Sequence, residues 1–479
     1  MLFYSPEFLI FSLVLLTVLA FVHRNTPRKV VLLIASYVFY MWWNPVFILL
    51  IVFATAVNYV IGAALARTED RLGRIALLSV ALGASLGLLA YFKYAGFLAN
   101  NTLILMRELG FSVHWTTLEI TLPVGISFYT FHTLSYTIDV YRRKIPATFS
   151  PIDYALYIAF FPQLACGPIV RAAQFLPQLR ERTRISCDQT TFFLILRGLA
   201  KKVLIADNIT LLPDAVFATP ESFPSVIIWL AAVCFAVQIY CDFSGYSDIA
   251  IGISRVLGYR IPLNFDHPYL ARNPSDFWRR WHISLSSWLR DYLYISIGGN
   301  REGRLRTYRN VMITMLLGGL WHGASWNYVL WGLMHGVFLI VHRAWGEWRQ
   351  RGNPSYRPSQ SWLAWFVSIL LMQYCVLVSW IAFRVRDFDK LWVALRKFVV
   401  FDFDFHLANI GLGMLSFFST LVLLAAFAAI HVTSHATGHL DRALGRARFV
   451  WAAAICFALG FVAVFLWPLE EQPFIYFQF

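Results

Sequence analysis

The sequence predicts an all-α protein that crosses a membrane several times, and three observations support this prediction. Of the 479 residues, 59% are hydrophobic and only 14% are charged, whereas about a quarter of the residues of a soluble protein are charged. The hydrophobic residues form long continuous runs and do not alternate as barrel strands do, so helices are the expected spanning elements. Short basic loops separate these runs. Because no long linker, repeat or low-complexity tract interrupts the chain, we predict one membrane domain over residues 1–479.

The net charge of +14 raises the question of a nucleic-acid partner. The basic residues lie in loops that are too short to form a nucleic-acid surface and that match the positive-inside pattern of membrane proteins. The six cysteines are scattered, mostly within apolar runs, and form no CxxC pair. We therefore predict membrane lipid and no nucleic acid as a partner, and the cysteines imply neither disulfides nor a metal site.

Spans are predicted near both ends of the chain. The first ones are expected at 8–22, 30–43, 46–66 and 75–92, and the last ones at 362–383, 409–431 and 449–467. The first run lacks a basic n-region, so we interpret it as a retained helix and not as a cleaved signal peptide. The loops at 24–29, 67–74 and 442–448 are basic and are therefore expected in the cytoplasm. Both termini then lie outside, which requires an even number of crossings, about ten.

The middle of the chain is less regular. Segment 120–141 is apolar but contains Pro123, Gly125, His132 and Asp139, and segment 160–171 contains two prolines and a glycine. Interrupted helices are tolerated in a membrane only where they are buried in protein or line a wet cavity. We therefore expect a broken helix at 120–141 and a re-entrant turn at 160–171.

Two carboxylates follow a predicted span at 226–240. Asp242 and Asp248 lie between apolar stretches, where a charge is costly unless it is paired or solvated. They either form ion pairs between helices or line a substrate path, and the sequence does not decide between these two roles.

Residues 273–294 predict an amphipathic, tryptophan-rich helix in the cytoplasmic interface. Ser275 is a suitable N-cap, the aromatic residues recur at helical spacing, and Arg279 and Arg280 lie on the polar side. His282 falls on this helix, where an isolated histidine is more often structural than catalytic. The loop that follows, 298–309, is glycine-rich and basic and includes Asn300 and Arg301. It can hold phosphates through arginine forks, although a plain positive-inside loop is the simpler interpretation.

His322 is the most informative ionisable residue in the chain. It lies within the apolar stretch LLGGLWHGASWNYVL at 316–330, next to Trp321. A helix from Arg309 to His322 is about 20 Å long, which places the imidazole near or beyond the middle of a hydrocarbon core of about 30 Å. An ionisable group at that depth predicts a functional site, and a neutral imidazole can act as a general base. The alternative is a histidine that packs between helices.

Several stretches together resemble one protein family. They are LPVGISFYTFHTLSYTIDVYR at 122–142, FFPQLACGPIVR at 160–171, KKVLIADN at 201–208, QIYCDFSGYSDIAIG at 238–252, FWRRWHISLSSWLRDYLYISIGGNR at 277–301, MLLGGLWHGASWNYVLWGLMHG at 315–336 and PFIYFQF at 473–479. The chain resembles the bacterial membrane-bound O-acyltransferases (MBOAT), in the branch of the alginate O-acetyltransferase membrane subunit. One departure is Cys241, where related proteins commonly carry phenylalanine.

The resemblance implies a fold, a site and a set of substrates. The fold would be a ring or funnel of tilted helices around a central tunnel, in the bacterial inner membrane. His322 would be the catalytic residue and His282 a second functional one. Acetyl-CoA would be the acyl donor from the cytoplasm, with no bound cofactor. The acceptor on the other side would be a periplasmic acetyltransferase or the exopolysaccharide itself, with alginate as the leading polysaccharide.

Further substrate contacts are expected on the same basis. Arg279, Arg280, Asn300 and Arg301, with Arg304, would bind the phosphates of coenzyme A, whereas Trp321, Asp242 and Asp248 would line the substrate path. Asn327, Trp326 or Tyr328 would donate to the oxyanion. A transient acyl-histidine is as compatible with the sequence as direct transfer.

Three rival functions follow from the same residues. A transporter would also contain broken helices and intramembrane carboxylates, although it predicts internal repeats that the sequence lacks. D-alanyl transfer to teichoic acid would use the same fold with a carrier protein as donor. A structural scaffold would tolerate the loss of His322.

Overall fold

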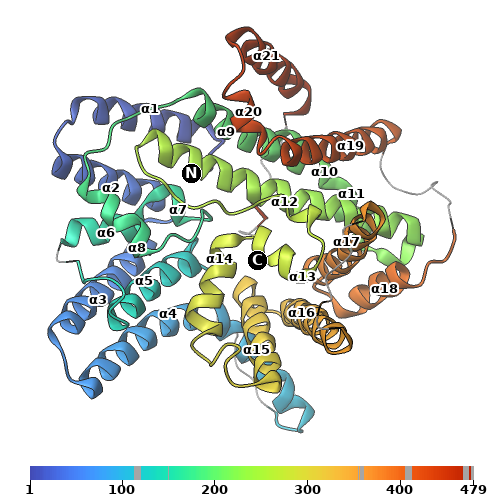
Figure 1. Cartoon of the computed structure of the whole chain (residues 1–479), viewed down its shortest axis with the longest axis horizontal. Coiled ribbons are helices and arrows are strands. Elements are labelled where there is room, and N and C mark those ends of the chain that lie inside the picture. Colours follow the sequence, from blue (N-terminus) through green and yellow to red (C-terminus); the bar gives the residue numbers. More distant parts are fainter. Residues whose placement is uncertain are drawn as a thin grey trace. The chain divides into compact units, whose positions relative to one another are not determined.

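The computed structural model describes residues 1–112, 120–148, 150–353, 355, 361–404, 413–467 and 474–475. Every regular element in these ranges is helical (Figure 1), which confirms the predicted all-α class for this part of the chain. Six helices are long and apolar enough to cross a membrane, and they span 45–67, 71–108, 225–256, 362–384, 416–436 and 449–466. The total of about ten crossings and the central tunnel stay predictions. Glu470, Glu471 and most of the stretch 473–479 lie outside the described residues.

The chain divides into two compact units, of which the first comprises 1–187 and 249–262. Its principal helices are α1 (Pro6–Phe21), α2 (Asn25–Met41), α3 (Ile48–Arg67), α4 (Arg71–Glu108), α5 (Ile126–Tyr141), α6 (Pro151–Ala159), α7 (Phe161–Leu164) and α8 (Ala172–Phe175). Helices α3 and α4 pack against α5, and fourteen of the sixteen residues of α5 are buried. α5 is unbroken, contrary to our expectation, because Pro123 and Gly125 precede its first residue. α4 extends well beyond the predicted span at 75–92.

The predicted basic loop at 24–29 is largely helical. Arg28 and Lys29 lie in the first turns of α2 and are buried. The guanidinium of Arg28 donates to the carbonyl of Leu257 at 3.2 Å, and Lys29 Nζ lies 2.6 Å from a carboxylate oxygen of Asp153. The expectation of a free loop was wrong here because these partners are distant in the sequence.

The second unit comprises 188–248 and 263–479. It starts with α9 (Gln189–Leu199), the π-helical segment η3 (Ala200–Ala206), α10 (Asp207–Ile209) and α11 (Leu211–Ala218). Helix α12 (Ser225–Val256) follows and contributes its last residues to the first unit. We had expected a span to end at Tyr240, but the helix continues through the stretch that carries both carboxylates.

The region predicted as one amphipathic helix at 273–294 consists of three pieces. These are α13 (Pro274–Arg280), α14 (Ile283–Trp288) and the π-helical segment η6 (Leu289–Tyr294). The N-cap is Asn273, whose side chain accepts from the N–H of Asp276, and not Ser275. The helix breaks at His282, and the face that we had expected at an interface is buried at Phe277 and Trp281.

The remaining elements include the helical hairpin that positions the site. They are α15 (Arg304–His322), α16 (Trp326–Gly352), α17 (Trp362–Arg384), α18 (Phe388–Val399), α19 (Met414–Ala436), α20 (Leu440–Leu444) and α21 (Phe449–Leu466). α15 and α16 lie side by side (Figure 1). A Cβ atom on Gly332 would lie 2.4 Å from the carbonyl oxygen of Met315, so only glycine permits this close approach of the two backbones.

Candidate active site

His322 is the last residue of α15, at the turn into α16. Its side chain is buried, with 5% of the residue exposed. Three aromatic rings surround the imidazole, at centroid distances of 4.9 Å for Trp321, 4.9 Å for Trp331 and 5.2 Å for Phe383. These rings come from α15, α16 and α17 respectively. An imidazole in such a position is shielded from bulk water, which strengthens any electrostatic interaction that it makes.

The turn after His322 has room for no side chain at its first position. A Cβ atom on Gly323 would lie 2.2 Å from the ring of Tyr328, which therefore covers this turn. Tyr328 in turn contacts Phe383 at a centroid distance of 4.9 Å. The glycine that follows His322 thus allows α16 to fold back tightly over the imidazole.

Asn327 links α16 to the end of α17. Its Nδ2 donates to the carbonyls of Ala382 and Phe383, at 3.2 and 3.1 Å. Both amide hydrogens are therefore used within the protein, and Asn327 has none left for an oxyanion unless these bonds break. Of the three expected donors, Tyr328 is buried beside the turn, whereas Trp326 is 53% exposed.

His282 lies between α13 and α14 in the left-handed conformation, with φ 41°. This conformation is uncommon for a residue other than glycine and is found where tertiary contacts enforce it. The responsible contact is Asn264, whose Oδ1 lies 3.0 Å from His282 Nδ1. The same oxygen accepts from the backbone N–H and from the hydroxyl of Ser284, at 3.3 and 2.9 Å.

This network determines the proton positions on His282. The N–H of Ser284 can donate only to an acceptor, which the NH2 group of Asn264 is not, so the atom facing His282 is the carbonyl oxygen Oδ1 and His282 carries its proton on Nδ1. Nε2 then has a lone pair, and it has no hydrogen-bond partner among the described residues. Burial lowers the pKa of His282 to about 3, so the side chain is neutral at physiological pH.

Trp321 contacts both histidines. Its ring centroid is 5.8 Å from that of His282 and 4.9 Å from that of His322. The structure thus brings together Trp321, His282 and His322, which the sequence had singled out separately. Sequence reasoning missed Asn264, Trp331 and Phe383, because their roles depend on contacts between distant segments.

The expected phosphate-binding residues lie away from this buried centre. Arg279 and Arg280 pair with Asp276 at 3.8 and 3.0 Å, and 73% of the Arg279 side chain is exposed. Asn300 and Arg301 are exposed in the turn between η6 and α15. Arg279, Asn300 and Arg301 therefore occupy surface positions and Arg280 is half-buried, whereas both histidines are inside.

The two carboxylates of α12 are ion-paired. Asp248 accepts two hydrogen bonds from Arg197, at 2.9 and 2.8 Å, and one from Lys201 at 2.7 Å. Asp242 lies 3.0 Å from Lys202 Nζ and accepts from the N–H of Ile475 at 2.7 Å. Asp248 therefore matches the interhelical ion-pair alternative, whereas Asp242 also reaches a cavity.

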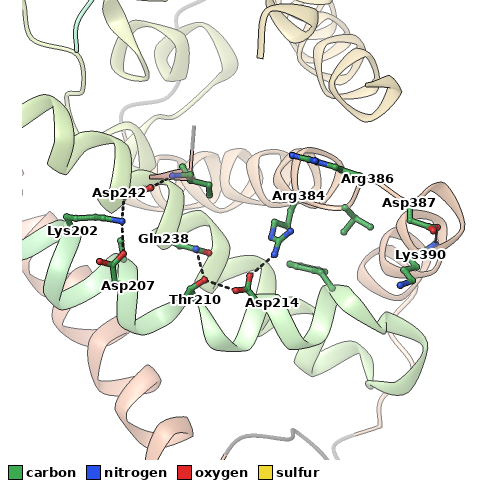
Figure 2. A pocket seen from close by; sticks show the side chains of 14 residues that line it. Lys202, Asp207, Thr210, Asp214, Gln238, Asp242, Arg384, Arg386, Asp387 and Lys390 are labelled. Atoms are coloured by element: carbon green, nitrogen blue, oxygen red, sulfur yellow. Dashed lines mark hydrogen bonds and ion pairs between the residues drawn. The ribbon is translucent and has the colours of Figure 1, made fainter. Parts of the chain in front are cut away.

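This cavity, which we call the polar pocket, has a volume of about 460 Å³. It is lined by Lys202, Ala206, Asp207, Thr210, Asp214, Phe217, Gln238, Asp242, Arg384, Val385, Arg386, Asp387, Lys390 and Ile475. Figure 2 shows Arg384 reaching Asp214, at 2.6 Å, and Lys202 between Asp207 and Asp242. Arg384, which lines this pocket, follows Phe383 in the sequence, and Phe383 contacts His322. The arginines at this wall were not anticipated as site residues.

Comparison with known proteins identifies the family of this chain. The model of the MBOAT, membrane-bound O-acyltransferase family, matches residues 141–385. The probable alginate O-acetylase AlgI of Pseudomonas putida is 39% identical and is covered over 100% of both chains. A peptidoglycan O-acetyltransferase of Helicobacter pylori is 34% identical over 78% of this chain and 73% of its own length. A teichoic acid D-alanyltransferase of Streptococcus thermophilus is 30% identical over 46% of this chain and 57% of its own length. The chain therefore belongs to the membrane-bound O-acyltransferase family and is a multi-pass membrane O-acetyltransferase.

Proposed function

We propose that the protein moves acetyl groups from cytoplasmic acetyl-CoA across the bacterial inner membrane for O-acetylation of a secreted polysaccharide. The observation that carries this proposal is the position of His322, which is buried among aromatic rings and contacts Phe383, the residue before Arg384 of the polar pocket. Alginate is the leading polysaccharide because of the name of the Pseudomonas putida relative. Peptidoglycan is the second candidate, from the name of the Helicobacter pylori relative.

His322 is the proposed general base. It removes the proton from the acceptor hydroxyl, whose oxygen attacks the thioester carbonyl carbon and forms a tetrahedral oxyanion. The C–S bond then breaks, and the imidazolium returns the proton to the departing thiolate of coenzyme A. The aromatic rings of Trp331 and Phe383 exclude water, so that acetyl-CoA is not hydrolysed while it waits for the acceptor.

His282 has a different proposed role. Its proton is on Nδ1 and its Nε2 lone pair is buried, so it can accept a hydrogen bond from an N–H or O–H group of a bound substrate. It cannot donate from Nε2 while it is neutral. We place it as the residue that orients the substrate next to Trp321.

The two substrates approach from opposite ends of α15. The basic N-terminal end, with Arg304, follows the loop that holds Asn300 and Arg301, and together with Arg279 and Arg280 it supplies the phosphate contacts for coenzyme A. α17 follows the basic C-terminal part of α16, with Arg343, Arg349 and Arg351, so the positive-inside rule puts the other end of α17, at Arg384, on the periplasmic side. The polar pocket therefore receives the hydroxyl from a periplasmic acetyltransferase or from the polysaccharide.

The test is the acetyl content of the secreted polysaccharide in cells that lack the protein and are complemented with wild type, His322→Ala, His322→Gln or His282→Ala. The amount of each variant in the membrane is measured in parallel, and His23→Ala, an exposed histidine outside the site, is the matched control. We expect His23→Ala to restore acetylation and both His322 variants to leave the polymer unacetylated. Full acetylation by His322→Ala would contradict the proposal and favour a transporter or scaffold.

A second experiment separates direct transfer from an acyl-histidine, and acetyl from D-alanyl transfer. The purified protein is incubated with radiolabelled acetyl-CoA, without acceptor, and then denatured under mild conditions. Label retained by wild type but not by His322→Gln would show an acyl-histidine; label retained by neither is expected for direct transfer. If the protein releases coenzyme A from acetyl-CoA only when acceptor is added, the D-alanyl carrier reaction is excluded as the main activity.

A further inference from the structure

A cluster of histidines in the second unit has no part in the proposed reaction. His267 precedes η5 (Pro268–Leu270), His431 and His435 are spaced one helical turn apart on α19, and His439 follows the end of α19. The ring centroids of His431, His435 and His439 lie 5.1, 5.3 and 5.0 Å from that of His267. Only 12 of the 479 residues are histidines, so a group of four neighbouring imidazoles is unusual in this chain.

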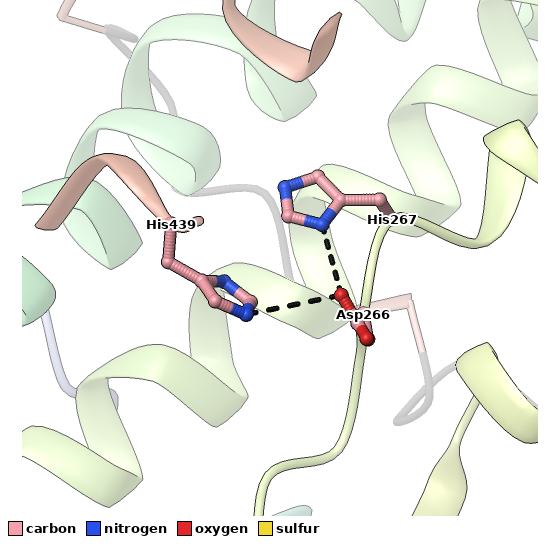
Figure 3. A group of neighbouring side chains, drawn as sticks. All are labelled: Asp266, His267 and His439. Atoms are coloured by element: carbon pink, nitrogen blue, oxygen red, sulfur yellow. Dashed lines mark hydrogen bonds and ion pairs between the residues drawn. The ribbon is translucent and has the colours of Figure 1, made fainter. Parts of the chain in front are cut away.

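A carboxylate joins the cluster. Asp266 Oδ1 lies 2.9 Å from His267 Nδ1 and 3.8 Å from His439 Nε2 (Figure 3). The side chains of His267 and His439 thus face one carboxylate oxygen from two different segments. Both histidines adopt positive φ angles, 47° and 81°, a conformation that costs free energy in residues other than glycine. The fold therefore holds both backbones in unusual conformations that direct these two side chains to Asp266.

We propose that Asp266, His267 and His439 bind a divalent transition-metal ion of the zinc(II) class. Two imidazole nitrogens and a carboxylate oxygen are a ligand set that zinc accepts, with bonds of about 2.0–2.1 Å and tetrahedral geometry, which places ligand atoms about 3.3 Å apart. The three ligand atoms here lie within 4.8 Å of one another, and the two measured separations of 2.9 and 3.8 Å bracket that spacing. Small side-chain rotations are enough to close the site around an ion.

The hydrogen bonds of Ser434 indicate which nitrogen of His267 binds the ion. Ser434 Oγ accepts from the N–H of Leu440 at 3.3 Å and lies 2.9 Å from His267 Nε2. A carboxylate oxygen only accepts, so without an ion the imidazole proton is on Nδ1, directed at Asp266, and Ser434 donates its own proton to Nε2. When an ion binds, Nδ1 must present a lone pair, so the imidazole proton moves to Nε2 and is donated to Ser434 Oγ. Ser434 thereby orients the ligand, as the outer partners of metal-bound histidines commonly do.

Two further histidines can complete the coordination. His431 is 7% exposed, and its Nε2 has no hydrogen-bond partner among the described residues. His435 is the other neighbour of His267 on α19. Asp266 has 44% of its side chain exposed, so an ion can enter from the aqueous side. The remaining position is then filled by one of these histidines or by water.

The site would connect α19 to the segment that holds His282. Asp266 and His267 come directly after Asn264–Phe265, and Asn264 is the residue that sets the tautomer of His282. The backbone N–H of Asp266 also donates to the carbonyl of Arg280, at 2.9 Å. A bound ion would thus fix residues 264–267 against α19 and keep Asn264 in place. This consequence for activity rests on the proposed function, whereas metal binding itself does not.

The experiment uses the full-length protein, purified in detergent without a polyhistidine tag and treated with chelator. Zinc(II) is added back, and stoichiometry and affinity are measured by elemental analysis and by competition with a chromophoric chelator. Cobalt(II) is used in parallel because its visible absorption reports direct coordination. Asp266→Asn and His439→Gln test the ligands, and His23→Gln is the matched control. Size-exclusion profiles verify that each variant is folded.

We expect one high-affinity zinc per wild-type and His23→Gln protein, with a cobalt spectrum typical of nitrogen and oxygen ligands. Each ligand variant should lose more than the ~10–100-fold in affinity that outer-partner mutations usually cost. If wild type binds no zinc and gives no cobalt spectrum, the proposal is wrong whether or not the variants fold. Equal affinity in wild type and in folded Asp266→Asn would also overturn it. Neither result would affect the transferase proposal, which depends on His322.

Discussion

The surroundings of His322 and the polar pocket are built in opposite ways. Around His322 the neighbours are aromatic rings from α15, α16 and α17. The polar pocket is lined largely by charged and polar side chains, several of which are paired. In the proposed reaction, the aromatic rings keep bulk water away from His322, and the polar pocket offers a route for a hydrophilic acceptor. The boundary between the two lies at the C-terminal end of α17.

The largest expected effect comes from substituting His322, among the aromatic rings. His322→Gln should lower acetyl transfer by at least the ~10²–10⁴-fold that a general base contributes. The protein should remain folded, because the histidine lies in ring contacts that glutamine can partly replace. Transfer of labelled acetyl by purified protein measures the rate, and His342→Gln, a half-buried histidine elsewhere on α16, is the control. A decrease of less than tenfold in the transfer rate would mean that His322 has only a packing role.

The next effect tests the ion pairs of α12. Asp248→Asn leaves Arg197 and Lys201 without their shared carboxylate, and breaking a buried pair from one side typically costs about 3–5 kcal/mol. We expect a large fall in the unfolding temperature of the protein. Unfolding is measured by tryptophan fluorescence in detergent. The control is Glu302→Gln, which breaks the exposed pair with Arg306 and should cost at most about 1 kcal/mol. Similar melting curves for both variants would show that the Asp248 network is not stabilising.

A smaller effect should follow from substituting Asn264, the hydrogen-bond partner of His282. In wild type the pKa of His282 is about 3, so this residue is neutral and should add no step to the activity between pH 5 and 9. Asn264→Asp puts a carboxylate beside Nδ1, which raises the pKa of His282. As pH falls through the raised pKa, Nε2 becomes protonated and loses its lone pair, so activity should fall at a higher pH than in wild type. If the folded, active variant loses activity at the same low pH as wild type, the Nε2 lone pair has no role in the reaction.

The smallest expected effect lies at the rim of the pocket. Arg384→Gln removes the pair with Asp214, whose side chains are 33% and 49% exposed, so stability should change by at most about 1 kcal/mol. If the acceptor uses this pocket, the KM for the acceptor should rise several-fold while the KM for acetyl-CoA stays constant. Arg343→Gln, which breaks an exposed pair with Glu347 on α16, provides the control. A rise only in the KM for acetyl-CoA would place the donor in this pocket.

Individual helices show where prediction from sequence works. The span expected at 362–383 is α17, Trp362–Arg384, and the one expected at 449–467 is α21, Phe449–Leu466. Hydropathy is a property of each segment by itself, so such helices can be located without any knowledge of their neighbours. The prediction at 273–294 was wrong about the break at His282, because that break depends on Asn264, 18 residues earlier in the sequence.

The sequence by itself determined that the protein is helical and membrane-spanning, and its motifs singled out His322, His282 and Trp321. Only the tertiary structure decided that the two histidines contact one tryptophan, that His282 carries its proton on Nδ1, and that Asp248 is paired with Arg197. It also decided that His267 meets Ser434, 167 residues further along the chain. The physical reason is that apolar periodicity is a property of each segment by itself. Hydrogen bonds and ion pairs require partners that only folding brings within about 3 Å.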